Sequence, residues 1–200
     1  MQLGIFGGTF DPPHFGHLIL AAEARFQLRL DRILFVLTPD PPHKQDRDIT
    51  PLEDRLAMLA AAISGEPAFE LSRVEIDRPG PHYALDTMQE LAKMHPNDEL
   101  VYLIGGDSLK NLPSWRRPQE FLAACHALGV MRRPGDDIDL GELEAELPGI
   151  KNKVRFIDAP LLEIASSELR QRIQAGEPFR YYMPLTVYKT IQERGIYRRD

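Results

Sequence analysis

The chain has 200 residues and a mass of 22.7 kDa, the size of one domain or of one domain with a small appendage. Hydrophobic residues form 43% and charged residues 27% of the sequence, which is close to the average for globular proteins and excludes intrinsic disorder, collagen-like repeats and coiled coils. The formal net charge is −6. Without a basic excess, we do not expect a general nucleic-acid surface, which needs a basic stripe to replace phosphate counterions.

Acidic residues concentrate in the segment 135–149, which contains no lysine or arginine. We interpret this segment as a solvated excursion rather than a partner site. No charge-free stretch approaches the roughly 18 apolar residues of a membrane-spanning helix, and the first residues do not have the pattern of a secretory signal. The only cysteine, Cys125, has no partner for a disulfide. We therefore expect a cytoplasmic protein that binds neither membrane nor nucleic acid.

Along the chain, apolar runs of strand length alternate with segments of helical spacing. The predicted strands are residues 2–6, 32–37, 69–76, 100–104, 127–131 and 154–157. The predicted helices are residues 15–26, 51–64, 85–94, 118–125, 167–174 and 184–194. For the second helix, Thr50 is expected as the N-cap because Pro51 and Glu53 follow at the spacing of a capping box.

This alternation predicts an α/β fold with a doubly wound parallel sheet, because its strands are continuously apolar and are joined by helices. We expect a single domain over residues 1–200, with a core over 1–160 and a small helical part over 161–200. In such sheets, ligands bind beyond the carboxyl ends of the strands. The rule selects the loops at residues 7–17, 39–44, 105–115 and 165–170.

The first of these loops combines features of a phosphate site. Gly7 and Gly8 let the backbone approach an anion, and the helix that follows presents its amides and the positive end of its dipole. His14 and His17 are three residues apart, so they share a face of the first helical turn. Phosphate binding is one interpretation, and zinc binding and a purely structural role for the histidines are the alternatives.

The string G-T-F-D-P-P-H-F-G-H at residues 8–17 resembles the signature of nucleotidyltransferases with an H-x-G-H motif. Their second motif, I-S-S-T-x-x-R, resembles I-A-S-S-E-L-R at residues 164–170. Ala165 replaces the first serine of that motif, and Ser167 replaces the threonine. Hydroxyls and an arginine at a helix start are suited to binding a triphosphate.

The chain is more closely similar to bacterial nicotinate-mononucleotide adenylyltransferases, whose further blocks recur in order. These blocks are residues 41–44, 82–87, 104–115, 132–135 and 188–197. The resemblance implies a Rossmann-like fold. It also implies that the phosphate of nicotinate mononucleotide attacks the α-phosphorus of ATP, giving nicotinate adenine dinucleotide and pyrophosphate in NAD biosynthesis. Mg²⁺ would be held mainly by substrate phosphates, without a dedicated protein ligand.

The resemblance also implies which residues form the site. Catalytic roles fall to His14, His17, Lys44 and Arg170. ATP contacts fall to Gly7, Gly8, Thr9, Phe10, His14, His17, Gly105, Asp107, Ser166, Ser167 and Arg170. Contacts with the nicotinate nucleotide fall to Gly8, Thr9, Lys44, Tyr83, Ala84, Thr87, Asp107, Leu109, Trp115 and Arg133.

Two of these residues also have a plainer interpretation. Trp115 lies among proline and arginine residues, so it is either a stacking platform for the pyridine ring or a half-buried packing residue. Asp107 follows a strand and two glycines, where it accepts a hydrogen bond from a ribose hydroxyl or serves as a helix N-cap.

His82 and Ala84 stand where the family has serine and threonine, which leaves the preference for acid over amide open. The alternatives are therefore an adenylyltransferase for nicotinamide mononucleotide or another phosphate acceptor, and a nucleotide-binding module without turnover. A dehydrogenase is disfavoured because the G-x-G-x-x-G fingerprint is missing. The resemblance is compatible with a homo-oligomer.

Overall fold

The computed structural model describes residues 1–40, 49–132, 138–160 and 162–198. Its centre is a parallel sheet of six strands in the order β3-β2-β1-β4-β5-β6. The strands are β1 (Gln2–Gly8), β2 (Arg32–Leu37), β3 (Phe69–Ser72), β4 (Glu99–Gly105), β5 (Ala127–Arg132) and β6 (Val154–Asp158). The order reverses between β1 and β4, as in a doubly wound sheet, and the predicted fold class is confirmed.

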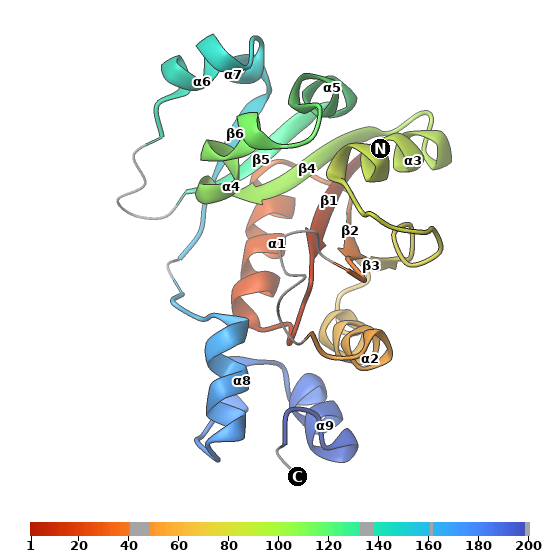
Figure 1. Ribbon diagram of the computed structural model, residues 1–200, viewed down its shortest axis with the longest axis vertical. Coiled ribbons are helices and arrows are strands. Elements are labelled where there is room, and N and C mark those ends of the chain that lie inside the picture. Colours follow the sequence, from red (N-terminus) through yellow and green to blue (C-terminus); the bar gives the residue numbers. More distant parts are fainter. Residues whose placement is uncertain (41–48, 133–137, 161, 199–200) are drawn as a thin grey trace.

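Helices cover both faces of this sheet (Figure 1). They are α1 (Phe15–Gln27), α2 (Leu52–Ile63), α3 (Ala84–Met94), α4 (Gly106–Lys110), α5 (Pro118–Ala124), α6 (Leu140–Glu146), α7 (Ile150–Lys153), α8 (Ser166–Gln174) and α9 (Leu185–Arg194), with short 3-10 turns at Leu112–Ser114 and Arg180–Tyr182. On one face, Leu20 and Leu59 pack with Phe35. On the other, Met88 and Phe121 pack with Val36.

The start of α2 differs from the prediction. Its N-cap is Pro51 rather than Thr50, and Pro51 makes no side-chain capping bond. The main chain of Thr50 is engaged elsewhere: its N–H donates to Asp11 and its carbonyl accepts from Arg55. The predicted capping box at Thr50 is therefore wrong, because tertiary contacts hold this residue outside the helix.

The strand predicted over residues 69–76 is also shorter than expected. It ends at Ser72 because the next residues form a turn, in which the N–H of Asp77 donates to the carbonyl of Arg73 at 2.9 Å. The side chains of Arg73 and Asp77 also form an ion pair of 2.7 Å.

The acidic segment contains a helix, α6, that the sequence pattern did not predict. Asp139 caps α6 by accepting a hydrogen bond of 2.6 Å from the N–H of Gly141. Leu143, Leu147 and Ile150 are buried against the core. The interpretation of residues 135–149 as a solvated excursion is therefore wrong for this part, because Leu143 and Leu147 anchor it, as does Ile150 directly after the segment.

The last two long helices form a separate cluster beside α2. Leu169 of α8 and Val187 and Ile191 of α9 are buried together with Met58 of α2. Figure 1 shows α8 and α9 at one end of the molecule, away from α3 and α5. This cluster brings the segment that follows β6 back to the carboxyl end of β1. In the described parts of the chain, no helix combines the length and the apolar character needed to cross a membrane.

Candidate active site

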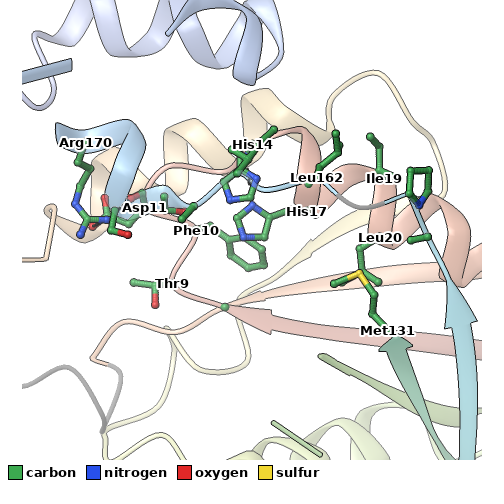
Figure 2. A pocket seen from close by; sticks show the side chains of 18 of the residues that line it. Thr9, Phe10, Asp11, His14, His17, Ile19, Leu20, Met131, Leu162 and Arg170 are labelled. Carbon is green, nitrogen blue, oxygen red and sulfur yellow. Dashed lines mark hydrogen bonds and ion pairs between the residues drawn. The ribbon is translucent and has the colours of Figure 1, made fainter. Parts of the chain in front are cut away.

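A cavity of about 500 Å³ lies at the carboxyl ends of β1 and β5, within the usual range for small-molecule sites. Its walls come from the loop after β1, from the first turns of α1 and from α8 (Figure 2). The lining includes Gly8, Thr9, Phe10, Asp11, His14, Gly16, His17, Met131, Arg132, Ile164, Ala165, Ser166, Ser167 and Arg170. Two of the four loops selected by the strand-end rule therefore meet here.

Aromatic rings form the floor beneath the loop. Phe10 is 2% exposed and lies 5.6 Å from Phe6 and 5.7 Å from Phe35, measured between ring centroids. Such aromatic pairs contribute about 0.5–1.5 kcal/mol each beyond their buried area. Phe10 has a left-handed backbone with φ of 48°, and this buried packing holds it there.

His14 and His17 lie side by side at the start of α1, as Figure 2 shows. Their ring centroids are 3.8 Å apart. The main-chain N–H of His14 donates to Nδ1 of His17 at 3.2 Å. Because Nδ1 accepts this bond, the neutral ring of His17 carries its proton on Nε2 and donates from that atom. The predicted pairing of the two histidines is confirmed.

The His14 side chain is more deeply placed than that of His17. It is 6% exposed, and burial lowers its pKa to about 4. Its Nδ1 atom has no hydrogen-bond partner among the residues that the structure describes. A buried polar atom without a partner costs about 1–3 kcal/mol. His14 is therefore a neutral ring with an unused polar atom beside a cavity.

Gly16 makes this placement of His14 sterically feasible. A Cβ at residue 16 would lie 3.0 Å from both Cε1 and Nδ1 of the His14 ring, closer than side chains normally pack. The glycine between the two histidines thus leaves room for the ring.

The start of α8 is tied to the same loop. Ser166 Oγ donates to the carbonyl of Pro12 at 2.9 Å, and Arg170 Nη1 donates to the carbonyl of Asp11 at 2.7 Å. The side chain of Arg170 is 26% exposed and lines the cavity. Hydroxyl, guanidinium and imidazole groups therefore face one space, a donor set that suits an anion with several oxygens.

Arg55 holds the base of the site, a role that the sequence pattern did not reveal. It is 2% exposed and donates to the carbonyls of Thr38 and Pro39 at 2.7 Å and of Thr50 at 2.8 Å. A longer contact of 3.5 Å reaches the carbonyl of Thr9. Burial lowers the pKa of this guanidinium, and the nearby Asp11 carboxylate opposes that effect.

Other predicted site residues lie outside this cavity. The Leu109 side chain is fully buried in the core. Thr87, 1% exposed, donates to Glu75 and accepts from Arg78. For Leu109 and Thr87 the structure thus shows packing and internal hydrogen bonds, and contact with a nucleotide stays a prediction.

Tyr83 and Trp115 are partly exposed. The guanidinium of Arg116 lies 4.5 Å from the ring centroid of Tyr83, and Trp115 packs against Phe121 at 5.2 Å between centroids. Asp107 is exposed and lies in the first turn of α4, whose N-cap is Gly105. The alternative of Asp107 as an N-cap is therefore wrong. Gly7 and Ala84, at the end of β1 and the start of α3, complete the predicted set.

Lys44 and Arg133 lie outside the described residues, so their predicted roles remain predictions. Within the described ranges, no group of three or more histidine, cysteine, aspartate or glutamate side chains is arranged to hold a metal ion. The zinc alternative for His14 and His17 thus gains no third ligand from these residues.

Comparisons with known proteins agree with this geometry. The model of the cytidylyltransferase-like family matches residues 5–172. A probable nicotinate-nucleotide adenylyltransferase of Thermomicrobium roseum is 45% identical over 98% of this chain and 92% of its own length. One of Geobacillus thermodenitrificans is 42% identical over 98% of this chain and 86% of its own length.

The fold has a counterpart among solved structures. The nicotinic acid mononucleotide adenylyltransferase of Plasmodium falciparum, solved in complex with NaAD, superimposes with a TM-score of 0.77 at 22% identity. The match covers 98% of this chain and 97% of that chain. The chain therefore belongs to the cytidylyltransferase-like family and, within it, to the nicotinate-nucleotide adenylyltransferases.

Proposed function

We propose that the chain joins ATP and nicotinate mononucleotide to form nicotinate adenine dinucleotide and pyrophosphate. The observation that carries this proposal is the convergence of His14, His17, Ser166 and Arg170 on one cavity at the carboxyl end of β1. The names of the relatives, at 42–45% identity over nearly the whole chain, support the choice of substrates. The single cysteine, without a disulfide partner in the sequence, suits a reducing cytoplasm.

The reaction requires positioning more than acid–base chemistry. A phosphate oxygen of the mononucleotide forms a bond to the α-phosphorus of ATP, and the bond from that phosphorus to the bridging oxygen of pyrophosphate breaks. The attacking oxygen is already anionic, so no protein base has to remove a proton. Catalysis then rests on holding the two phosphates in line and on donors for the charge that develops.

The described donors suit this task. His17 can donate from Nε2, and Arg170 supplies a cation that lines the same cavity. Ser167 lies in the first turn of α8, where the helix amides add to the attraction for an anion. We assign contact with the α-phosphate to His17 and contact with the leaving pyrophosphate to Arg170, with Lys44 as a further cation.

We propose that Mg²⁺ enters with ATP. The Asp11 carboxylate at the cavity accepts from Tyr197 and Thr50 and lies near Arg170, so it is committed within the protein. Nε2 of His17 and the guanidinium of Arg170 are donors, which fit phosphate oxygens better than a metal. Mg²⁺ held by phosphates and water would neutralise part of the phosphate charge.

The test is product formation by the purified protein with ATP and Mg²⁺. Nicotinate mononucleotide and nicotinamide mononucleotide are offered together, and both dinucleotides are resolved by chromatography. The proposal predicts pyrophosphate release in step with nicotinate adenine dinucleotide. Equal use of both acceptors would show that His82 and Ala84 have relaxed the choice between them. Activity on neither would overturn the proposal.

A further inference from the structure

The buried carboxylate of Asp11 joins parts of the chain that are far apart in sequence. Asp11 is 4% exposed. Its Oδ1 accepts a hydrogen bond of 2.6 Å from the hydroxyl of Tyr197, and its Oδ2 accepts one of 3.4 Å from the N–H of Thr50. Tyr197, three residues after the end of α9, therefore reaches the loop that follows β1.

Arg170 lies next to the same carboxylate, as Figure 2 shows. Its Nη1 atom is 3.8 Å from Asp11 Oδ2, while the same nitrogen donates to the main-chain carbonyl of Asp11 at 2.7 Å. The side-chain contact is thus a loose one. A guanidinium beside a carboxylate with two open oxygens normally forms the tighter, two-pronged pair.

Tyr197 already donates to one of the two oxygens that such a pair would use. The tyrosine hydroxyl competes for Oδ1 and fixes the orientation of the carboxylate, in which Arg170 Nη1 lies 3.8 Å from Oδ2. Burial and the Asp11 charge raise the pKa of Tyr197, so the hydroxyl keeps its proton and remains a donor at neutral pH. The guanidinium then stays turned toward the cavity that it lines.

We propose that Tyr197 is a positioning residue for the nucleotide site. By donating to Asp11 Oδ1, its hydroxyl competes with Arg170 for the carboxylate and so favours contact of the guanidinium with the phosphates of the nucleotide. This inference rests on the proposed function in one respect, namely that the nucleotide is ATP.

The experiment compares ATP binding and kinetics of the wild type with those of Tyr197→Phe, which keeps the ring and removes the hydroxyl. We expect the Kd and KM for ATP to rise about tenfold, as the carboxylate engages Arg170. The KM for nicotinate mononucleotide should stay unchanged. Tyr188→Phe is the matched control, because Tyr188 packs on Phe179 at 5.1 Å between centroids and lies in the same helical region. It should bind ATP like the wild type.

A second variant separates positioning from a merely structural role. Adding Asp11→Asn to Tyr197→Phe replaces the competing charge with a neutral amide, so ATP affinity should return toward the wild-type value. If Tyr197 only supported the fold, the double variant would be less stable and would bind ATP no better than the single one. Asp11→Asn alone should bind ATP at least as tightly as the wild type, which gives a readout even where Tyr197→Phe folds poorly.

Unchanged ATP affinity in folded Tyr197→Phe, no recovery in the double variant, or weaker ATP binding by Asp11→Asn would each overturn the inference. Failure of the proposed function has a different signature, because the wild type itself would then neither bind ATP in the titration nor form the dinucleotide.

Discussion

His14 and His17 stack with their ring centroids 3.8 Å apart, and His14 has a pKa of about 4 because it is buried. Burial therefore keeps His14 unprotonated at neutral pH. Two positive rings at this separation would repel each other strongly in a partly dry site.

The first prediction concerns stability in mild acid. The unfolded chain takes up a proton on His14 near its ordinary pKa of 6.5, whereas the folded protein does so only near pH 4. Stability is therefore full above pH 6.5 and falls as the pH decreases toward 4, by about 1.4 kcal/mol per pH unit for this group. Urea unfolding across this range should show a smaller slope for His14→Gln than for the wild type. Identical slopes would contradict the burial of a neutral His14.

The second prediction concerns His17. His17→Ala removes the Nε2 donor and should lower kcat on the order of 100- to 1,000-fold, as for other transition-state donors. The stability loss should be about 1–3 kcal/mol, since the hydrogen bond from the His14 N–H and the ring contacts with Phe6 and Phe10 are lost. Steady-state kinetics and thermal unfolding measure the two effects. His126→Ala is the control, because that histidine lies 3.5 Å from Glu99 on the surface. A His17→Ala enzyme with wild-type kcat would refute the assigned role.

The third prediction concerns Arg55. Arg55→Lys keeps the charge but cannot reach the carbonyls of Thr38, Pro39 and Thr50 together, so buried acceptors lose their partners. Hydrogen bonds from a charged donor contribute about 1.5–3 kcal/mol each, and we expect a loss of about 3–5 kcal/mol in the free energy of unfolding. Chemical denaturation measures it.

Arg194→Lys is the control for Arg55→Lys, because Arg194 forms a surface ion pair with Asp54 at 3.0 Å. Such exposed pairs contribute about 0–1 kcal/mol. Similar losses in the free energy of unfolding of the two variants would show that the buried hydrogen bonds of Arg55 stabilise the fold no more than a surface ion pair does.

The fourth prediction concerns Thr87, whose hydroxyl donates to Glu75 at 2.5 Å and accepts from Arg78 at 3.0 Å. Thr87→Val should reduce the free energy of unfolding by about 1–3 kcal/mol, because the buried Glu75 carboxylate loses its hydrogen bond from the threonine hydroxyl. Thr87→Ser, which retains the hydroxyl, should lose less. Denaturant titration decides between these values. A Thr87→Val protein as stable as the wild type would leave nucleotide contact as the better explanation for this threonine.

The sheet was predictable because its strands are short, apolar and uninterrupted, so both the order of elements and the parallel arrangement follow from the pattern. The 32–37 strand has the predicted bounds. The missed features depend on tertiary contacts. Thr50 is not the N-cap because its main-chain N–H and carbonyl form hydrogen bonds with Asp11 and Arg55. The sequence pattern did not predict α6 because its acidic side chains outnumber the leucines that anchor it.

The site shows the same division. The pairing of His14 with His17 and the approach of α8 follow from motif and topology. The central roles of Arg55 and Asp11 do not, because a buried arginine or aspartate looks in sequence like any surface charge. Tyr197 carries no local signal either, since its partner lies at the other end of the chain.

Asp11 and Tyr197 are 186 residues apart in the sequence. Their contact can therefore form only late in the synthesis of the chain. When the ribosome has produced the whole parallel sheet, the loop with both histidines already exists, but the carboxylate within it still lacks its phenol partner. Contacts of such long sequence separation close late, because the entropy of the intervening chain opposes them. A nascent chain therefore forms the contact between Asp11 and Tyr197 only after α9 has been made and has docked beside α2.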